Sequence, residues 1–241
     1  MEKPKYRSAL IVGTGPGLSA SLARLFARNG LAVSLAARQT DKLAALAKET
    51  GAAVHACNAA DQKDVAALFD ALDAPSRTPD VVVYNASNRV RGALVDLPPD
   101  DVKRAIEISA FGAFLVSQQA ARRMLPKSHG AIFLTGATAG VKGFALSATF
   151  AMGKFALRGL AQSMARELQP QGHPCRAFRD RRRHPERRAA GAGQRARQPA
   201  RSRRHRRDLL GARCSSTAAP GAGRSRSGRG WRSSRRTGGA V

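Results

Sequence analysis

The sequence predicts an α/β fold with a doubly wound parallel sheet over residues 1–172 of the 241-residue chain. Short apolar segments alternate with longer segments of helical periodicity, an order that places helices on both faces of a parallel sheet. In addition, a glycine-rich turn directly follows the first apolar segment, where a strand passes tightly into a helix. Residues 173–241 lack this alternation and form a second region of different composition.

The first half of the pattern repeats strand and helix. Residues 8–13 (SALIVG) are apolar and end in the turn, and residues 18–29 keep helical spacing. A second apolar strand is predicted at 31–37. The helix predicted at 41–50 has Asp41 as its candidate N-cap, because an aspartate side chain accepts hydrogen bonds from the free N–H groups of a first helical turn. A third strand follows at 52–57.

The second half continues the alternation with longer helices. An amphipathic helix is predicted at 61–72, and a fully buried type of strand (DVVVY) follows at 80–84. The remaining elements are a long helix at 98–124, a strand at 130–135 and a helix at 147–168. Right-handed crossovers between these strands give a Rossmann-type sheet covered on both faces. The sheet is expected to be truncated after about five strands, with a domain boundary after residue 172.

Cysteine usage and hydropathy limit the class of protein. The three cysteines lack C-x-x-C spacing, so neither a disulfide framework nor a zinc or other metal site is predicted. The N-terminal segment has no apolar stretch typical of a signal peptide, and nowhere do ~18 consecutive apolar residues occur. A cytoplasmic protein without a membrane span is therefore expected.

The glycine-rich turn predicts a dinucleotide site. Between the first strand and the first helix, the chain has the sequence Gly13-Thr14-Gly15-Pro16-Gly17-Leu18-Ser19. Glycines let the backbone approach a pyrophosphate, and the start of a helix offers it free N–H groups and a positive dipole end. The alternative is a purely steric one, because a tight turn between strand and helix also needs glycine.

The residue after the second strand bears on the choice of dinucleotide. An acidic residue at this point would accept the ribose hydroxyls of NAD, but the chain has Arg38. A guanidinium group pairs with a 2′-phosphate, so NADP is the expected cofactor, with NAD as the alternative. The structural alternative for Arg38 is a solvated surface arginine.

A series of landmarks follows the predicted strands in order: the glycine turn, Arg38, Asn58 with Asp61, Asn85-Ala86-Ser87, and Lys154 on the helix after the fifth strand. In this order, residues 7–172 resemble the short-chain dehydrogenase/reductase family. The resemblance implies that Asn58 and Asp61 belong to the cofactor site, Asn58 facing the adenine. It also implies that Asn85 and Ala86 line the cofactor near its ribose and that Lys154 holds the nicotinamide ribose. The structural alternatives are that Asn85 only caps the end of a strand and that Lys154 is a solvated lysine on the surface of a helix.

The same resemblance shows departures at the catalytic positions. Family members use a Tyr-x-x-x-Lys pair on one helical face, in which the tyrosine exchanges the substrate proton, but here Phe150 precedes Lys154. The family's serine aligns with Ala137, and Thr138 would supply a hydroxyl only if the register shifts by one. The family's asparagine aligns with Ser109. The expected catalytic candidates are therefore Lys154, Thr138 and Ser109, without a phenolic proton donor.

Region 173–241 is dominated by arginine. It contains 21 Arg, no Lys and three acidic residues. This region therefore contributes +18 to the chain's net charge of +26. Arg, Ala, Gly, Pro and Ser are what GC-rich codons encode out of frame. Read from the second base of each codon, His173–Pro185 permits an apolar strand and a glycine turn that resemble the family's sixth strand and cofactor loop. We therefore predict a disordered, frame-shifted tail, and an evolved tail that binds nucleic acid or other polyanions is the alternative.

These observations predict an NADP-dependent oxidoreductase that acts on an unknown small carbonyl or alcohol compound, with activity impaired by Phe150 and Ala137. A non-catalytic nucleotide-binding protein is the second hypothesis, and a basic nucleic-acid-binding protein is the third. The helices at 98–124 and 147–168 are the expected contact surfaces of a homo-oligomer.

Overall fold

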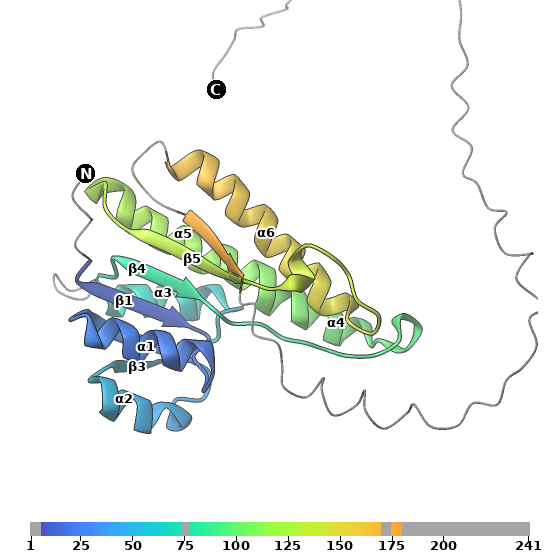
Figure 1. The fold of residues 1–241 in the computed structure, drawn as a ribbon, viewed down its shortest axis with the longest axis horizontal. Coiled ribbons are helices and arrows are strands. Elements are labelled where there is room, and N and C mark those ends of the chain that lie inside the picture. Colours follow the sequence, from blue (N-terminus) through green and yellow to red (C-terminus); the bar gives the residue numbers. More distant parts are fainter. Residues whose placement is uncertain (1–5, 74–77, 170–174, 180–241) are drawn as a thin grey trace, which may run out of the picture. The chain divides into compact units, whose positions relative to one another are not determined.

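The structure, a computed structural model, describes residues 6–73, 78–169 and 175–179. These residues belong to the first of the two units into which the chain divides, 1–184 and 185–241. Their sheet is parallel, with the strand order β3-β2-β1-β4-β5-β6 of a Rossmann-type doubly wound fold (Figure 1). The strands are β1 (Ser8–Val12), β2 (Ala32–Ala37), β3 (Ala53–Ala56), β4 (Val81–Tyr84), β5 (Ala131–Gly136) and β6 (Cys175–Arg179).

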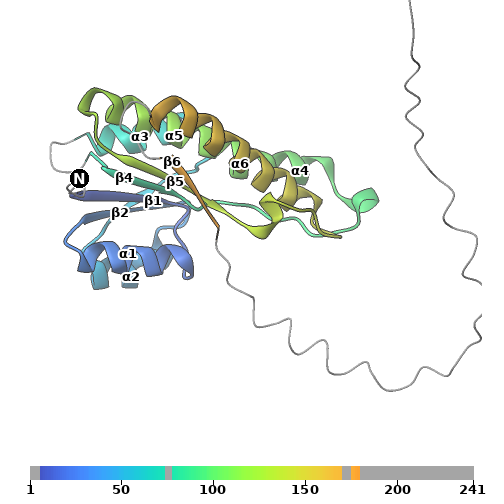
Figure 2. The same ribbon diagram turned by 45° about the horizontal axis from the view of Figure 1, so that its top comes forward.

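Helices cover both faces of the sheet, as the alternation predicts (Figure 2). On one face lie α1 (Leu18–Arg28) and α2 (Ala44–Thr50), and on the other lie α3 (Gln62–Ala71), α5 (Gly112–Met124) and α6 (Ala148–Leu168). Successive strand residues point to opposite faces of the sheet, and Leu10 and Ile11 therefore lie in two different apolar clusters. Both are fully buried because helices cover both faces. The predicted N-cap Asp41 is corrected: a short 3₁₀ turn, η1 (Asp41–Leu43), leads into α2 without a side-chain cap.

The helix predicted at 98–124 is interrupted at its centre. It consists of α4 (Pro99–Ile106), a π-helical turn η3 (Glu107–Phe111) and α5. The buried Tyr84 hydroxyl donates a hydrogen bond to Ile108 O, and a Cβ at Gly112 would lie 2.4 Å from Ala59 O. The turn therefore lies tightly against the ends of β3 and β4. Such π-helical turns are frequent at functional sites.

The sheet also extends one strand beyond its predicted end. β6 pairs in parallel with β5, from Ile132 opposite Cys175 to Gly136 opposite Arg179. Parallel pairing uses backbone N–H and C=O groups, so a composition rich in arginine does not prevent it. The folded domain therefore continues past residue 172. Residues 180–241, on which the prediction of a disordered, frame-shifted tail mainly rests, lie outside the described residues.

The carboxyl ends of the strands align at one edge of the sheet. Val12 of β1 is in register with Ala36 of β2 and with Tyr84 of β4. The strand order changes direction between β1 and β4, and ligands bind at such a switch point in doubly wound folds. In the part of the chain that the structure describes, no helix is both long enough and apolar enough to cross a membrane.

Candidate functional site

Gly13 ends β1 in a conformation that glycine adopts more readily than other residues. Its φ is +83°, and a Cβ at this position would lie 2.2 Å from the backbone N of Ala86. The N–H groups of Gly13 and Thr14 both donate to Ala36 O, at 2.9 and 3.2 Å. The steric explanation for glycine in this turn therefore holds at Gly13.

Gly15 and Gly17 have no such steric reason. Neither has a left-handed φ, and a Cβ at either position would meet no atom within 4 Å. Gly17 precedes α1, whose first turn has no side-chain cap, so the backbone N–H groups of Leu18, Ser19 and Ala20 remain available. Glycines next to open space at a helix start are expected where phosphates approach the backbone. The turn therefore fits the pyrophosphate of a dinucleotide.

Asn85 connects this turn to the end of β4. Its Nδ2 donates to Ser19 Oγ at 2.7 Å, and Ser19 Oγ donates to Gly13 O at 3.2 Å. The backbone N of Asn85 also donates to Val12 O at 2.8 Å. Asn85 therefore has a structural role that links β1, α1 and β4, in addition to its place at the edge where the cofactor is expected. Ser19 is the last residue of the predicted turn, but its side-chain contacts with Asn85 and Gly13 were not predicted.

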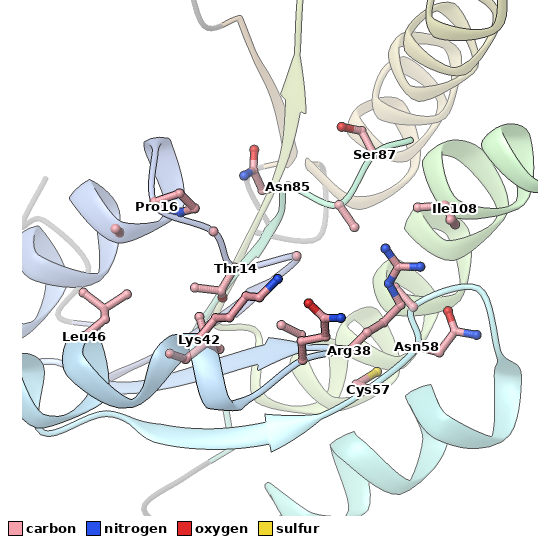
Figure 3. Close-up of a pocket in the computed structure, with 18 of the residues that line it drawn as sticks. Thr14, Pro16, Arg38, Lys42, Leu46, Cys57, Asn58, Asn85, Ser87 and Ile108 are labelled. Carbon is pink, nitrogen blue, oxygen red and sulfur yellow. The ribbon is translucent and has the colours of Figure 1, made fainter. Parts of the chain in front are cut away.

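The ends of β1 to β4 border a cleft of about 770 Å³ at this edge (Figure 3). It brings together seven of the predicted cofactor residues, Gly13, Thr14, Gly15, Arg38, Asn58, Asn85 and Ala86. Among the described residues that line the cleft, none is an aspartate or a glutamate. The predicted Gly17 and Leu18 lie outside this lining, at the start of α1.

Two cations extend into this cleft from the segment after β2. Arg38 and Lys42 are both exposed, and neither forms an ion pair within the described residues (Figure 3). Arg24 also lines the cleft, but its guanidinium pairs with Glu49 at 2.7 Å. Lys42 was missed by sequence analysis, and its only signal was its position one turn after Arg38. The pair can hold a phosphate group.

Asp61 is another predicted cofactor residue that lies outside the lining of the cleft. Its Oδ1 accepts hydrogen bonds from the backbone N of Lys63 and of Asp64, at 2.7 and 3.1 Å, so it is the N-cap of α3. The cleft lining contains Asn58 but not Asp61. The carboxylate of Asp61 therefore stabilises a helix start, and its assignment to the cofactor site stays a prediction.

Lys154 is a buried residue of α6, with 4% of its surface exposed. Its Nζ donates to Thr135 O at 2.7 Å, and burial lowers the pKa of its amine to about 8. It is therefore not a solvated helix lysine. A cavity of about 170 Å³ lies beside it and is lined by Ala137. Thr138 is exposed and absent from this lining. The structure therefore favours the register that places Ala137 at the position of the family's serine, and it does not favour Thr138 as a donor of a hydroxyl group there.

Ser109 lies in the π-helical turn and is 2% exposed. Its Oγ accepts a hydrogen bond from the backbone N of Asn88 at 3.3 Å. A Cβ at Gly153 would lie 2.7 Å from the Cβ of Ser109, so the turn contacts α6 directly beside Lys154. Ser109 therefore holds the segment after β4 close to α6, and it lines neither cavity described above.

Comparison with known proteins identifies the family. The family model for short chain dehydrogenases matches residues 7–176. The chain belongs to the short-chain dehydrogenase/reductase family. The fold, the glycine turn and the position of Lys154 agree with this membership.

Three relatives illustrate the similarity. The (21S)-21-acetoxyl-apo-melianone synthase of Melia azedarach is 31% identical over 169 residues, which cover 68% of this chain and 62% of that protein. A short-chain dehydrogenase from Rhodopseudomonas palustris has 30% identity and a TM-score of 0.69, covering 77% of this chain and 89% of that one. A gluconate 5-dehydrogenase from Burkholderia cenocepacia, solved with NADP and tartrate, has 29% identity and a TM-score of 0.67, covering 72% and 70%. The chain spans about three fifths of the length of the curated relative.

This short-chain dehydrogenase/reductase has a phenylalanine, Phe150, one turn before the lysine, and Lys154 Nζ lies 5.7 Å from the centre of its ring. The chain's two tyrosines lie elsewhere. Tyr84 is fully buried and bonded to Ile108 O, and burial raises the pKa of its hydroxyl. Tyr6 precedes β1, at the opposite edge of the sheet. Neither tyrosine can replace the missing proton donor.

The structure adds Arg89 to this part of the site. Its guanidinium carbon lies 5.1 Å from the centre of the Phe150 ring, and its Nη2 donates to Ser147 Oγ at 3.2 Å. Arg89 lies in a segment without periodic pattern, so sequence analysis missed it. The only available signal was its place shortly after Asn85, at the carboxyl end of β4.

Proposed function

We propose that this chain is an NADP-dependent oxidoreductase that acts on a small carbonyl or alcohol compound with slow turnover. The observation that supports the cofactor is the pair Arg38 and Lys42 in a cleft whose described lining contains no carboxylate. Such a pair attracts a 2′-phosphate, whereas a carboxylate would accept hydrogen bonds from the ribose hydroxyls of NAD and repel the phosphate of NADP. The related gluconate 5-dehydrogenase contains NADP, which supports the same choice.

The slow turnover follows from the side chains next to Lys154. NADPH, when bound, supplies the hydride. The chain then has to hold a proton near the substrate oxygen, and Phe150 has none to give. The ammonium of Lys154 can take this role below about pH 8, where it keeps its proton. General acid catalysis typically contributes ~10²–10⁴ in rate, so we expect a chain without the phenol to turn over slowly.

Titration calorimetry with NADPH and NADH tests the cofactor assignment. We expect the wild type to bind NADPH about tenfold more tightly than NADH or better, and Arg38→Asp to reverse this preference. Arg104→Asp is the matched control, since Arg104 is exposed on α4 and absent from the cleft lining. Equal affinities of the wild type for both dinucleotides would overturn the assignment.

A second candidate is an NADP-binding protein without catalytic turnover, which Phe150 and Ala137 favour. NADPH oxidation over a panel of aldehydes and ketones separates the two candidates. Slow turnover that Lys154→Met abolishes supports the enzyme. Tight NADPH binding without turnover of any panel member supports the binding protein.

We also propose that the chain forms a homo-oligomer through helices of the 98–124 and 147–168 regions. Phe111 and Phe114 in the first region, and Met152 and Phe155 in the second, are all more than 40% exposed. Exposed apolar side chains of this size are frequent at protein contacts. Light scattering of the wild type and of Phe155→Glu tests this, and a wild-type monomer would refute it.

A further inference from the structure

The part of the site around Phe150 is positively charged. Residues 85–95 and 137–158 contain five lysines and arginines and no aspartate or glutamate. These stretches are the segment after β4, the segment after β5 and the first half of α6, which contains Phe150 and Lys154. Within the described residues, neither Arg89 nor Lys154 forms an ion pair with a carboxylate. A surface that carries charge of one sign attracts ligands of the opposite sign.

Arg89 is held in place although its side chain is exposed. On one side of it, the backbone N of Asn88 donates to Ser109 Oγ. On the other side, the hydroxyl of the fully buried Thr149 donates to Val90 O at 2.7 Å, and Val90 N donates to that same hydroxyl at 3.3 Å. The backbone around Arg89 is therefore tied to both the π-helical turn and α6.

The guanidinium itself is also oriented. It lies against the Phe150 ring and donates through Nη2 to Ser147 Oγ. Lys154 contacts the same ring from within α6, so one aromatic side chain lies beside two cations. A planar guanidinium that rests on a ring keeps a fixed direction for its remaining N–H groups, which suits bidentate binding of an anion.

We propose that Arg89 binds an anionic group of the substrate, so that the substrate is a carbonyl or hydroxyl compound with a carboxylate near its reacting carbon. The inference rests on the proposed function, because it places the reacting group beside Lys154. A phosphate group shares the chemistry that Arg89 recognises, and the choice of probes below distinguishes the two anions.

Calorimetric titration of the full chain, alone and saturated with NADPH, tests this. The probes are levulinate, its neutral methyl ester and hydroxyacetone phosphate. The variants are Arg89→Met, which keeps an apolar stem on Phe150, Arg89→Lys, which keeps the charge without the fork, and Arg104→Met as the exposed control. All variants retain the 21 arginines of region 173–241, so non-specific attraction of anions to that region cancels in the comparison.

We expect the wild type to bind levulinate about tenfold more tightly than the ester, and Arg89→Met to remove that difference while Arg104→Met keeps it. Arg89→Lys should show a smaller loss than Arg89→Met. Tighter binding of the phosphate probe than of levulinate, lost in Arg89→Met, would support the anion site and identify phosphate as its ligand. Equal binding of levulinate by the wild type and Arg89→Met overturns the inference. Failure of NADPH to bind, with the Arg89 difference retained on the chain alone, would overturn only the proposed function.

Discussion

Removal of the buried charge at Lys154 should change how stability depends on pH. Burial lowers the pKa of this amine from 10.5 to about 8. The native state therefore binds the proton less tightly than the unfolded chain does. Between about pH 8 and 10.5 the unfolded chain binds more protons than the native state, so the free energy of unfolding increases as the pH rises. Below about pH 8 both states are protonated, and the native state is destabilised by the full cost of burying the charged amine.

The size of the effect follows from the same two values. A tenfold change in proton affinity corresponds to about 1.4 kcal/mol, so the cost at pH 7 is of the order of 3 kcal/mol. Most of it should disappear by pH 10. Lys154→Met removes the titration, and it also removes the hydrogen bond to Thr135 O, but that loss is nearly independent of pH. From pH 7 to pH 10, the free energy of unfolding of the wild type should therefore increase by about 2 to 3 kcal/mol more than that of Lys154→Met.

Urea unfolding at several pH values between 7 and 10 measures this difference. Lys103→Met, at an exposed position of α4, is the matched control and should keep the wild-type pH dependence. Parallel profiles of the wild type and Lys154→Met would refute the reasoning, because they would show that Lys154 titrates alike in the native and unfolded states.

Four further predictions concern the cofactor cleft and the catalytic position. Gly13→Ala should lower the free energy of unfolding by about 2 kcal/mol or more in urea titrations, because of its positive φ and the clash with the segment after β4. Gly15→Ala should leave stability within about 1 kcal/mol but weaken NADPH binding in calorimetry, and unchanged affinity would contradict the phosphate assignment. Lys42→Met should weaken NADPH about tenfold and leave NADH nearly unchanged, and an equal loss for both would show that Lys42 does not contact the 2′-phosphate. Phe150→Tyr alone should not give robust NADPH oxidation, whereas the double variant with Ala137→Ser should exceed it, since the two groups act as a unit; robust turnover by the single variant would contradict this.

The convergence of the cofactor residues could be predicted from the sequence. Gly13, Arg38, Asn58 and Asn85 each follow a predicted strand, and parallel strands present their carboxyl ends at one edge of the sheet. The missing proton donor at Phe150 could be predicted too, because the identity of one residue decides whether a phenol is present. Both conclusions depend on local pattern and chain order alone.

Contacts between segments far apart in the sequence could not be predicted in this way. Arg89 meets Ser147 and Phe150 only because two backbone anchors, in the π-helical turn and in α6, fix the segment after β4. Burial of Lys154, and with it the lowered pKa, depends on how α6 packs against the end of β5. β6 escaped prediction for a different reason, because strand pairing uses backbone groups and the side-chain pattern of this segment indicates no strand. Sequence alone thus determined which groups reach the edge of the sheet, and tertiary packing decided which of them are charged, buried and in contact.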